Sequence, residues 1–237
     1  MEYLKQLVDT YQPNEETVAL VQRSRLVLLA GISGAGKDTV KRALVDSNLL
    51  FHDIVSHTTR QPRRNNNKLE VDGVDYHFID QQTALSMLEQ RTFVEAKFVH
   101  GTVYGTSAAE IQHACDAQRV AITDIDVQGV AEFKKIAPDS ISIFIVPPAY
   151  DVWLERLKSR YATHEEFEAE WPKRRTSSIA ELTHALEVPY YHFIINDDLE
   201  RAVRVTNDIA MREDVFYEKD IEARLRAEQL LKQIEQS

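Results

Sequence analysis

The chain has 237 residues, a formal net charge of -10 and a pI near 5.3. This acidic balance argues against a protein that coats nucleic acid, whose surface would be basic overall, but it leaves room for a small anionic ligand in a local basic cluster. A single cysteine, Cys115, excludes an intramolecular disulfide, and the charged N-terminal stretch has no apolar run of signal-peptide or membrane length. We therefore expect a cytoplasmic enzyme with no nucleic-acid or membrane partner.

The first 54 residues predict a helical arm followed by a strand, a glycine-rich turn and a helix. Pro13 interrupts the arm, and Asn14 is a suitable N-cap for its second helix. Residues 25–31, "RLVLLAG", form a short apolar run that is typical of a fully buried parallel strand. Residues 37–48 then show the apolar spacing of a helix.

The turn between that strand and that helix reads "GISGAGKDT", residues 31–39. A GxxxxGK loop directs backbone N–H groups and the positive end of a helix at phosphates, and Lys37 would reach the β and γ phosphates. Ser or Thr normally follows this lysine and ligates Mg²⁺, but here Asp38 follows it. Three arrangements remain open: Thr39 supplies a hydroxyl, Asp38 binds Mg²⁺ or its water, or substrate phosphates hold the ion together with Asp124.

Residues 55–108 change to short mixed segments with turn signals, interrupted by a helix predicted over 81–92. Further buried strands are predicted at 119–126, 140–148 and 190–197, alternating with helices as in a doubly wound sheet. The charged segment 157–178 has the composition of a mobile cover, and the chain after Leu199 is predicted to be helical to its end.

Two stretches carry groups suited to chemistry outside the loop. "SHTTRQPRR", residues 56–64, combines hydroxyls with arginines that suit a second phosphate. In "ITDID", Asp124 and Asp126 alternate, so both are expected to project from one face of a strand, at the end where open α/β sheets bind ligands. These carboxylates suit metal or base contacts.

Five blocks follow the phosphate loop in order: "SHTTRQPR", "EVDGVDYHF", "FVEAKFVHGTVYGTS", "DIDVQG" and "IIND". From Leu26 to about Ala210 the chain thereby resembles the guanylate kinase family. The resemblance implies an α/β fold with a P-loop NTPase-type parallel sheet flanked by helices, an inserted mixed-strand subdomain that binds a nucleoside monophosphate, and a helical lid. The expected parts are an N-terminal helical extension (1–24), the core (25–54, 109–156 and 179–213), the GMP-binding subdomain (55–108), the lid (157–178) and a C-terminal helix (214–237).

The resemblance also implies roles for residues on the acceptor side. Those implied to hold the phosphate of GMP are Ser56, Arg60, Arg63, Tyr76 and Tyr104, and those implied to read guanine are Glu95, Thr106 and Asp126. Glu70 is assigned to the acceptor site, although the insertion "RNNNKL" before it disturbs the family spacing. Ionised carboxylates only accept hydrogen bonds, so they suit the N1–H and 2-amino donors of guanine, a pair that adenine lacks.

On the ATP side, the implied binding residues are Gly31, Ile32, Ser33, Gly34, Ala35, Gly36, Lys37, Asp38, Thr39, Arg156, Asn196 and Asp197. The implied catalytic residues are Lys37, Arg60, Arg63, Asp124, Arg160 and Arg174, because phosphoryl transfer is accelerated mainly by alignment and by neutralisation of charge. Arg175 is an additional neighbour. The lid is longer than usual and contains Trp171 and Pro172, and Tyr161, Phe167 and Trp171 are predicted to form a small hydrophobic anchor.

The leading hypothesis is therefore an enzyme that transfers the γ-phosphoryl of ATP to GMP with Mg²⁺. Asp38 also resembles the residue at this position in ribose 1,5-bisphosphate kinases, but a sugar phosphate would not need Glu95 or Asp126. A guanylate-kinase-like interaction module without catalysis is a third reading, although such modules can dispense with the phosphate loop that is complete here. The oligomeric state is left open.

Overall fold

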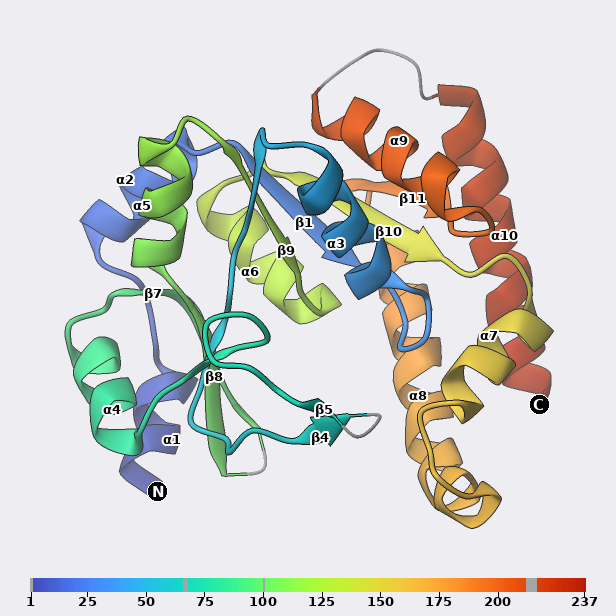
Figure 1. Ribbon diagram of the computed structural model, residues 1–237, viewed down its shortest axis with the longest axis horizontal. Helices are drawn as coiled ribbons and strands as arrows, with labels where there is room; N and C mark the ends of the chain where they lie inside the picture. The colour runs from blue at the N-terminus through green and yellow to red at the C-terminus, as the bar shows by residue number, and fades with distance from the viewer. Residues whose placement is uncertain (1, 66–67, 100, 212–216) are drawn as a thin grey trace. The chain divides into compact units, whose positions relative to one another are not determined.

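The computed structural model of the protein describes residues 2–65, 68–99, 101–211 and 217–237 (Figure 1). The chain divides into two compact units. One contains residues 1–26, 50–123 and 131–140, and the other contains residues 27–49, 124–130 and 141–237. No described helix is both long enough and apolar enough to cross a membrane.

The second unit is a layer of parallel strands with helices against it. Its elements are β1 (Leu26–Ala30), α3 (Lys37–Ser47), β10 (Ile141–Val146), α7 (Tyr150–Lys158), α8 (His164–Glu187), β11 (Tyr191–Ile195), α9 (Leu199–Ala210) and α10 (Tyr217–Gln236). Strand β10 pairs in parallel with β1 on one side, with Leu29 opposite Ile143, and with β11 on the other, with Phe144 opposite Phe193. Every residue of β1 is buried, as expected of its continuous apolar run.

The first unit combines a parallel strand pair with a mixed sheet. Its elements are α1 (Glu2–Asp9), α2 (Glu15–Arg23), β2 (Phe51–Asp53), β3 (His57–Thr58), β4 (Arg64–Asn65), β5 (Lys68–Leu69), β6 (His77–Phe78), α4 (Gln81–Glu89), β7 (Phe93–Val99), β8 (Thr102–Ser107), α5 (Ala108–Asp116) and β9 (Val120–Asp124), and α6 (Val127–Ile136) spans the division. Strands β2 and β9 are parallel, and the mixed sheet has the order β6-β3-β8-β7.

The N-terminal arm folds onto this mixed sheet. Leu4 and Val8 of α1 join a buried cluster with Leu88, Phe93 and Val103. The predicted N-cap of the second helix is confirmed, because the side chain of Asn14 accepts a hydrogen bond of 2.7 Å from the backbone N–H of Thr17. The parallel sheet with flanking helices and the inserted mixed sheet confirm the predicted fold class.

One expectation about the end of a strand is wrong. Strand β9 stops at Asp124, so Asp126 does not share a strand face with it. Asp126 instead precedes α6 and accepts a 2.7 Å hydrogen bond from the N–H of Gly129, because a carboxylate just before a helix satisfies an unpaired backbone donor. The chain after Leu199 is helical in its described part, as expected: α9 ends at Ala210, Met211 caps it, and α10 runs from Tyr217 to Gln236. The interval 212–216 lies outside the described residues.

Candidate functional site

The glycine-rich loop of the second unit leads directly from β1 into α3. Gly36 is the N-cap residue of α3 with φ +93°, a conformation that favours glycine. A Cβ on Gly36 would lie 2.3 Å from Nδ2 of Asn196, so the loop also has no space for a larger residue. Lys37 folds over the loop and donates to the carbonyls of Gly31 and Ile32. The predicted phosphate cradle thus ends at a helix N-terminus, where backbone N–H groups lack intrahelical partners.

Residues from β11, α7 and the segment after α7 support the outside of this loop. Asn196 is buried and donates from Nδ2 to the carbonyl of Ala35 at 2.8 Å. Arg156 donates from Nη2 to the carbonyl of Asn196 at 3.3 Å, while its buried Nη1 makes no hydrogen bond. Arg160 donates to the hydroxyl of Ser33 at 3.2 Å. Of the residues predicted to bind ATP, Asn196, Arg156 and Ser33 are therefore brought together around the loop.

Asp38 and Asp124 form a carboxylate pair beside the first turn of α3. Loss of hydration and repulsion by Asp124 raise the pKa of Asp38. Burial by itself would raise the pKa of Asp124 as well, but Lys41, 2.8 Å away, outweighs it and lowers that pKa. Thr39 is exposed on the same turn. Two close carboxylates and a hydroxyl are a donor set that fits Mg²⁺, which usually takes one or two carboxylates together with substrate phosphates and water.

The lid segment carries aromatic contacts and the predicted arginines. Phe167 contacts Tyr161 with ring centroids 5.8 Å apart and Trp171 with centroids 5.5 Å apart, and Trp171 reaches the buried Trp153 of α7 at 5.9 Å. The predicted hydrophobic anchor is thus confirmed. Arg174 is exposed and donates from Nε to the hydroxyl of Tyr161 at 2.9 Å.

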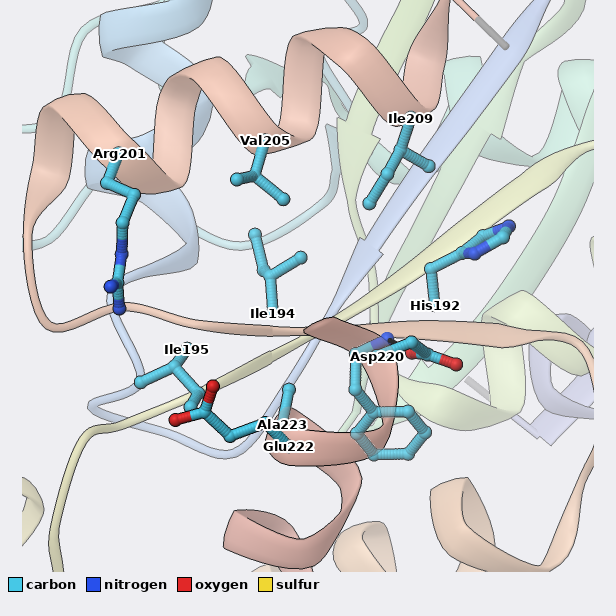
Figure 2. A pocket seen from close by; sticks show the side chains of 10 residues that line it. His192, Ile194, Ile195, Arg201, Val205, Ile209, Asp220, Glu222 and Ala223 are labelled. Carbon is cyan, nitrogen blue, oxygen red and sulfur yellow. Dashed lines mark hydrogen bonds between the residues drawn. The ribbon is translucent and has the colours of Figure 1, made fainter. Parts of the chain in front are cut away.

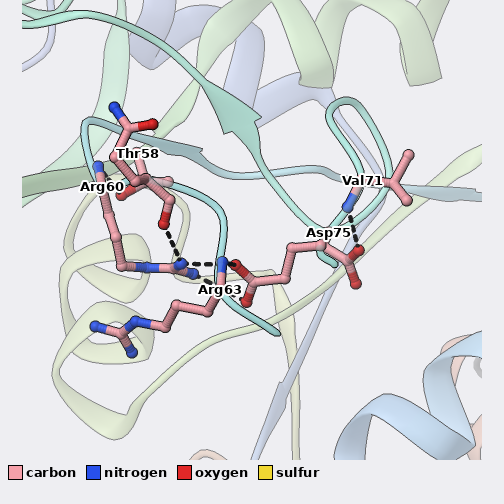
Figure 3. A network of polar contacts seen from close by, with 7 residues as sticks. Thr58, Arg60, Arg63, Val71 and Asp75 are labelled. Atoms are coloured by element: carbon pink, nitrogen blue, oxygen red, sulfur yellow. Dashed lines mark hydrogen bonds and ion pairs between the residues drawn. The ribbon is translucent and has the colours of Figure 1, made fainter. Parts of the chain in front are cut away.

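On the acceptor side, Arg60 and Glu70 form a two-pronged ion pair (Figure 3). Nη1 and Nη2 of Arg60 lie 2.6 and 3.1 Å from the two carboxylate oxygens of Glu70, and the backbone N–H of Arg63 donates to the same carboxylate at 2.7 Å. The guanidinium also lies over the ring of Tyr76, 5.1 Å from its centroid. The Arg60 side chain lowers the pKa of Glu70, which keeps the carboxylate ionised. The insertion before Glu70 therefore leaves it joined to the predicted phosphate-binding arginine.

A second acceptor cluster lies across β7 and β8. Glu95 is buried, and its Oε1 accepts hydrogen bonds of 3.0 Å from both the N–H and the hydroxyl of Thr106. Tyr104 lies two residues earlier on β8, with its ring centroid 6.1 Å from that of Tyr76. Within the first unit, the pair predicted to read guanine is thus connected through neighbouring strands to the cluster of Arg60 and Glu70.

Other predicted residues are found in separate surroundings. The backbone carbonyl of Ser56 accepts a hydrogen bond from the N–H of His77. Arg63 is exposed. Asp197, predicted near adenine, forms an ion pair with Arg201 of α9. Asp126 belongs to the second unit and is exposed.

The comparisons with known proteins agree with this geometry. The family model described as guanylate kinase matches residues 23–213. A guanylate kinase of Syntrophotalea carbinolica is 38% identical over 191 residues, covering 79% of this chain and 85% of the relative, and one of Pseudomonas fluorescens Pf-5 is 36% identical over 178 residues, covering 75% and 82%. This chain belongs to the guanylate kinase family. The solved structure of a guanylate kinase from Anaplasma phagocytophilum has the same fold, with a TM-score of 0.60, 23% identity and coverage of 88% of this chain and 95% of that one.

Within this guanylate kinase fold, sequence reasoning missed two charged residues of the loop surroundings. Lys41 lies one helical turn after Lys37, so the spacing already placed it on the same face of α3. Glu181 of α8 interacts electrostatically with Lys37, Asp126 and Arg174; burial is the main reason that its pKa is raised, and its carboxylate accepts from the hydroxyl of Ser177 at 2.8 Å. No motif in the sequence distinguishes Glu181 from the other acids of α8.

Proposed function

We propose that this member of the guanylate kinase family transfers the γ-phosphoryl group of ATP to GMP, giving ADP and GDP. The observation that carries the proposal is the coexistence of a complete phosphate loop with the buried Glu95–Thr106 pair. A phosphate loop alone would suit any nucleoside triphosphatase, but a buried acceptor pair suits a base that presents adjacent donors.

In this proposal the loop N–H groups and Lys37 bind the ATP phosphates. Arg160 and Arg174 neutralise charge on the phosphoryl group as it moves, which is where enzymes of this chemistry gain most of their rate. The unpartnered Nη1 of Arg156, next to the loop, is available for ATP. Asn196 holds the loop in shape through the carbonyl of Ala35.

Asp38 and Asp124 would hold Mg²⁺, with Thr39 as a further oxygen donor. The fit rests on the pair itself, because two carboxylates in contact repel each other and a divalent cation would remove that repulsion. When bound, the ion would neutralise charge on the β and γ phosphates. Lys41 keeps the Asp124 carboxylate ionised and oriented.

On the acceptor side, Arg60, Arg63, Tyr76 and Tyr104 would hold the phosphate of GMP, and Ser56 would add a hydroxyl. Glu95, Thr106 and Asp126 would read the guanine edge. We assign Glu70 a supporting role, because a carboxylate repels a phosphate but can orient the guanidinium of Arg60.

An acceptor screen tests the proposal. Purified protein with ATP and Mg²⁺ should form ADP with GMP, and much less with AMP or ribose 1,5-bisphosphate. Glu95→Gln should lower kcat/KM for GMP by about 100-fold, because one acceptor becomes a donor at a buried position. ADP formation only with the sugar phosphate would refute the proposed function. Unchanged GMP kinetics in the Glu95→Gln variant would refute the base-reading role of Glu95. Lack of turnover with every acceptor would instead favour an interaction module.

A further inference from the structure

The C-terminal helix α10 lies beyond the family match, which ends at residue 213, and packs on α8 and β11 of the second unit. Its buried residues Ala223, Ala227, Leu230 and Ile234 recur at helical spacing. Near its start, Asp220 accepts a hydrogen bond of 2.5 Å from the N–H of Phe193 in β11. Figure 2 shows this end of α10 beside β11, with a cavity of about 100 Å³ lined by α9, β11 and α10. Helix α10 is therefore fixed to the strand layer at its first turn.

The middle of α10 is joined to the end of α8. Arg224 donates to the carbonyl of Leu186 at 3.1 Å, and its guanidinium lies 4.5 Å from the ring centroid of Phe193. A single side chain of α10 thus connects the last turn of the lid helix to the adjacent strand.

The other end of α10 is held by an arginine from α8. Arg175 donates from Nε to the carbonyl of Ile234 at 3.0 Å and from Nη2 to the carbonyl of Glu235 at 2.7 Å. These carbonyls belong to the last turn of α10, where intrahelical donors run out and the helix carries partial negative charge. A guanidinium fork is well matched to two adjacent acceptors, so the contact defines the orientation of α8 at residue 175.

Arg174 lies in α8 between Arg175, which contacts α10, and Pro172, where the helical hydrogen bonding is interrupted. Pro172 has no N–H to continue the helical bonding, and the Thr176 hydroxyl donates to its carbonyl at 2.9 Å, two features that permit bending. Consecutive helical residues diverge by about 100°. Because Arg175 is held against α10, the direction in which the Arg174 side chain projects from α8 is also set. This holds even if the part of α8 before Pro172 bends.

We propose that α10 positions the lid arginine Arg174 for phosphoryl transfer through the fork that Arg175 donates to its last carbonyls. Arg175 is then a positioning residue, since it acts through Arg174 and touches no reacting group. The inference rests on the proposed function. It predicts a defect in the chemical step rather than in substrate binding, because Arg174 contributes to the charge of the transition state.

The test compares wild type with Arg175→Gln, Arg175→Lys and a control on the same helix, Lys173→Gln. Lys173 is an exposed cation that pairs with Glu170 at 2.8 Å. Misplacing a catalytic group by a fraction of an ångström typically costs one or two orders of magnitude, so Arg175→Gln should lower kcat about tenfold with KM for ATP and GMP within about twofold of wild type. Arg175→Lys should recover part of kcat because its ammonium donates to one carbonyl, and Lys173→Gln should match wild type.

The outcomes separate this inference from the function beneath it. A wild type that does not phosphorylate GMP refutes the proposed function. An active wild type with unchanged kcat in a folded Arg175→Gln variant refutes only the positioning role, as does an equal loss of kcat in Lys173→Gln. Thermal unfolding of each variant establishes folding. If Arg175→Gln does not fold, Arg175→Lys decides: a lower kcat at an unchanged unfolding midpoint supports the inference, and a wild-type kcat overturns it.

Discussion

At the residue scale, the cluster that we propose to hold the phosphate of GMP depends on one carboxylate, which would orient an arginine and not bind the phosphate itself. Glu70 holds both terminal nitrogens of Arg60 and the backbone N–H of Arg63, and the Arg60 and Glu70 side chains are each only 9% exposed. An arginine in such a fork loses little further conformational freedom when a phosphate binds, so the cost of ordering it is already met in the folded protein.

Glu70→Gln should therefore weaken GMP binding while sparing ATP binding. The amide keeps one acceptor oxygen but loses the charge-assisted fork, an interaction of about 1.5–3 kcal/mol that corresponds to a KM for GMP at least tenfold higher. Steady-state kinetics with each substrate varied in turn measure the effect. Asp75→Asn is the matched control, because Asp75 is an acid of the same loop region and its carboxylate accepts from the N–H of Val71 at 2.8 Å (Figure 3). Equal effects of both substitutions on GMP would contradict the role.

The residue scale also shows where sequence reasoning succeeds. Gly31, Gly36 and Lys37 could be assigned because a phosphate loop is a local structure, fully specified by a few neighbouring residues between a strand and a helix. The fork between Arg60 and Glu70 could not be assigned, since it depends on how the insertion between them folds, and β4 and β5 pair there as a short antiparallel ladder. Contacts between residues that come together only when a longer segment folds back leave no local sequence pattern, whereas contacts within one turn do.

At the element scale, the short parallel pair β3–β6 contains two histidines in contact. His57 lies opposite His77 in the register, and their ring centroids are 4.6 Å apart. Burial, helped by the neighbouring His77, lowers the pKa of His57 to about 4, and Glu110 and Asp72 offset only part of this shift. His77 in turn contacts Glu110 at 3.0 Å. The imidazole of His57 is therefore neutral in the folded protein near neutral pH.

This arrangement predicts a loss of stability in mild acid. Between pH 6.5 and 4 the unfolded chain binds a proton at His57 that the folded chain does not, so the free energy of unfolding falls as the pH is lowered through this window. The contribution is complete above pH 6.5 and absent below pH 4. Allowing for partial exposure, it is on the order of 1–2 kcal/mol.

Denaturant unfolding of wild type and His57→Gln at several pH values measures this contribution. The variant should lose less stability than wild type between pH 6.5 and 4. His164→Gln, which replaces a largely exposed histidine of α8, should follow the wild-type curve. Parallel curves for wild type and the His57 variant would show that the buried imidazole does not contribute.

The helices repeat the contrast between local and distant information. Asn14 caps α2, as its position before an apolar helical run predicts, and Asp80 caps α4 in the same way. By contrast, the contact between Arg175 and the end of α10 joins residues 59 and 60 positions apart, and nothing in either segment marks the other. The prediction that Asp126 lies on a strand is wrong for a related reason. The alternation of apolar and acidic residues favours a strand, but α6 begins at the next residue and the Asp126 carboxylate caps it.

At the scale of the whole molecule, the groups that we propose to bind the two substrates belong to different units. The glycine-rich loop, the Asp38–Asp124 pair and the lid arginines belong to the second unit, while Arg60, Glu70, Glu95 and Thr106 belong to the first. The net charge of -10 opposes anionic substrates over the molecule as a whole, so their binding depends on these local basic clusters.

Each substrate should therefore protect from amide hydrogen exchange the segments that we propose to bind it. A ligand at 100 times its dissociation constant stabilises the form that binds it by about 2.7 kcal/mol, which slows exchange through any opening that abolishes binding. GMP alone should slow exchange in residues 56–60, 93–99 and 101–107. A non-hydrolysable ATP analogue alone should slow exchange in residues 31–40 and 195–197. AMP in place of GMP is the control and should protect little in either set.

The segment that begins α6 makes this experiment decisive for the guanine site. Asp126 is the one proposed base-reading group in the second unit, and its carboxylate holds the N–H of Gly129. If it reads guanine, GMP must slow exchange at residues 127–130 together with residues 93–107, because ligand binding then favours the folded form of both segments. Protection of 93–107 without 127–130 would leave Glu95 and Thr106 as the base-reading groups and reduce Asp126 to a helix cap. Protection of the glycine-rich loop by GMP alone would contradict the assignment of the acceptor to the first unit.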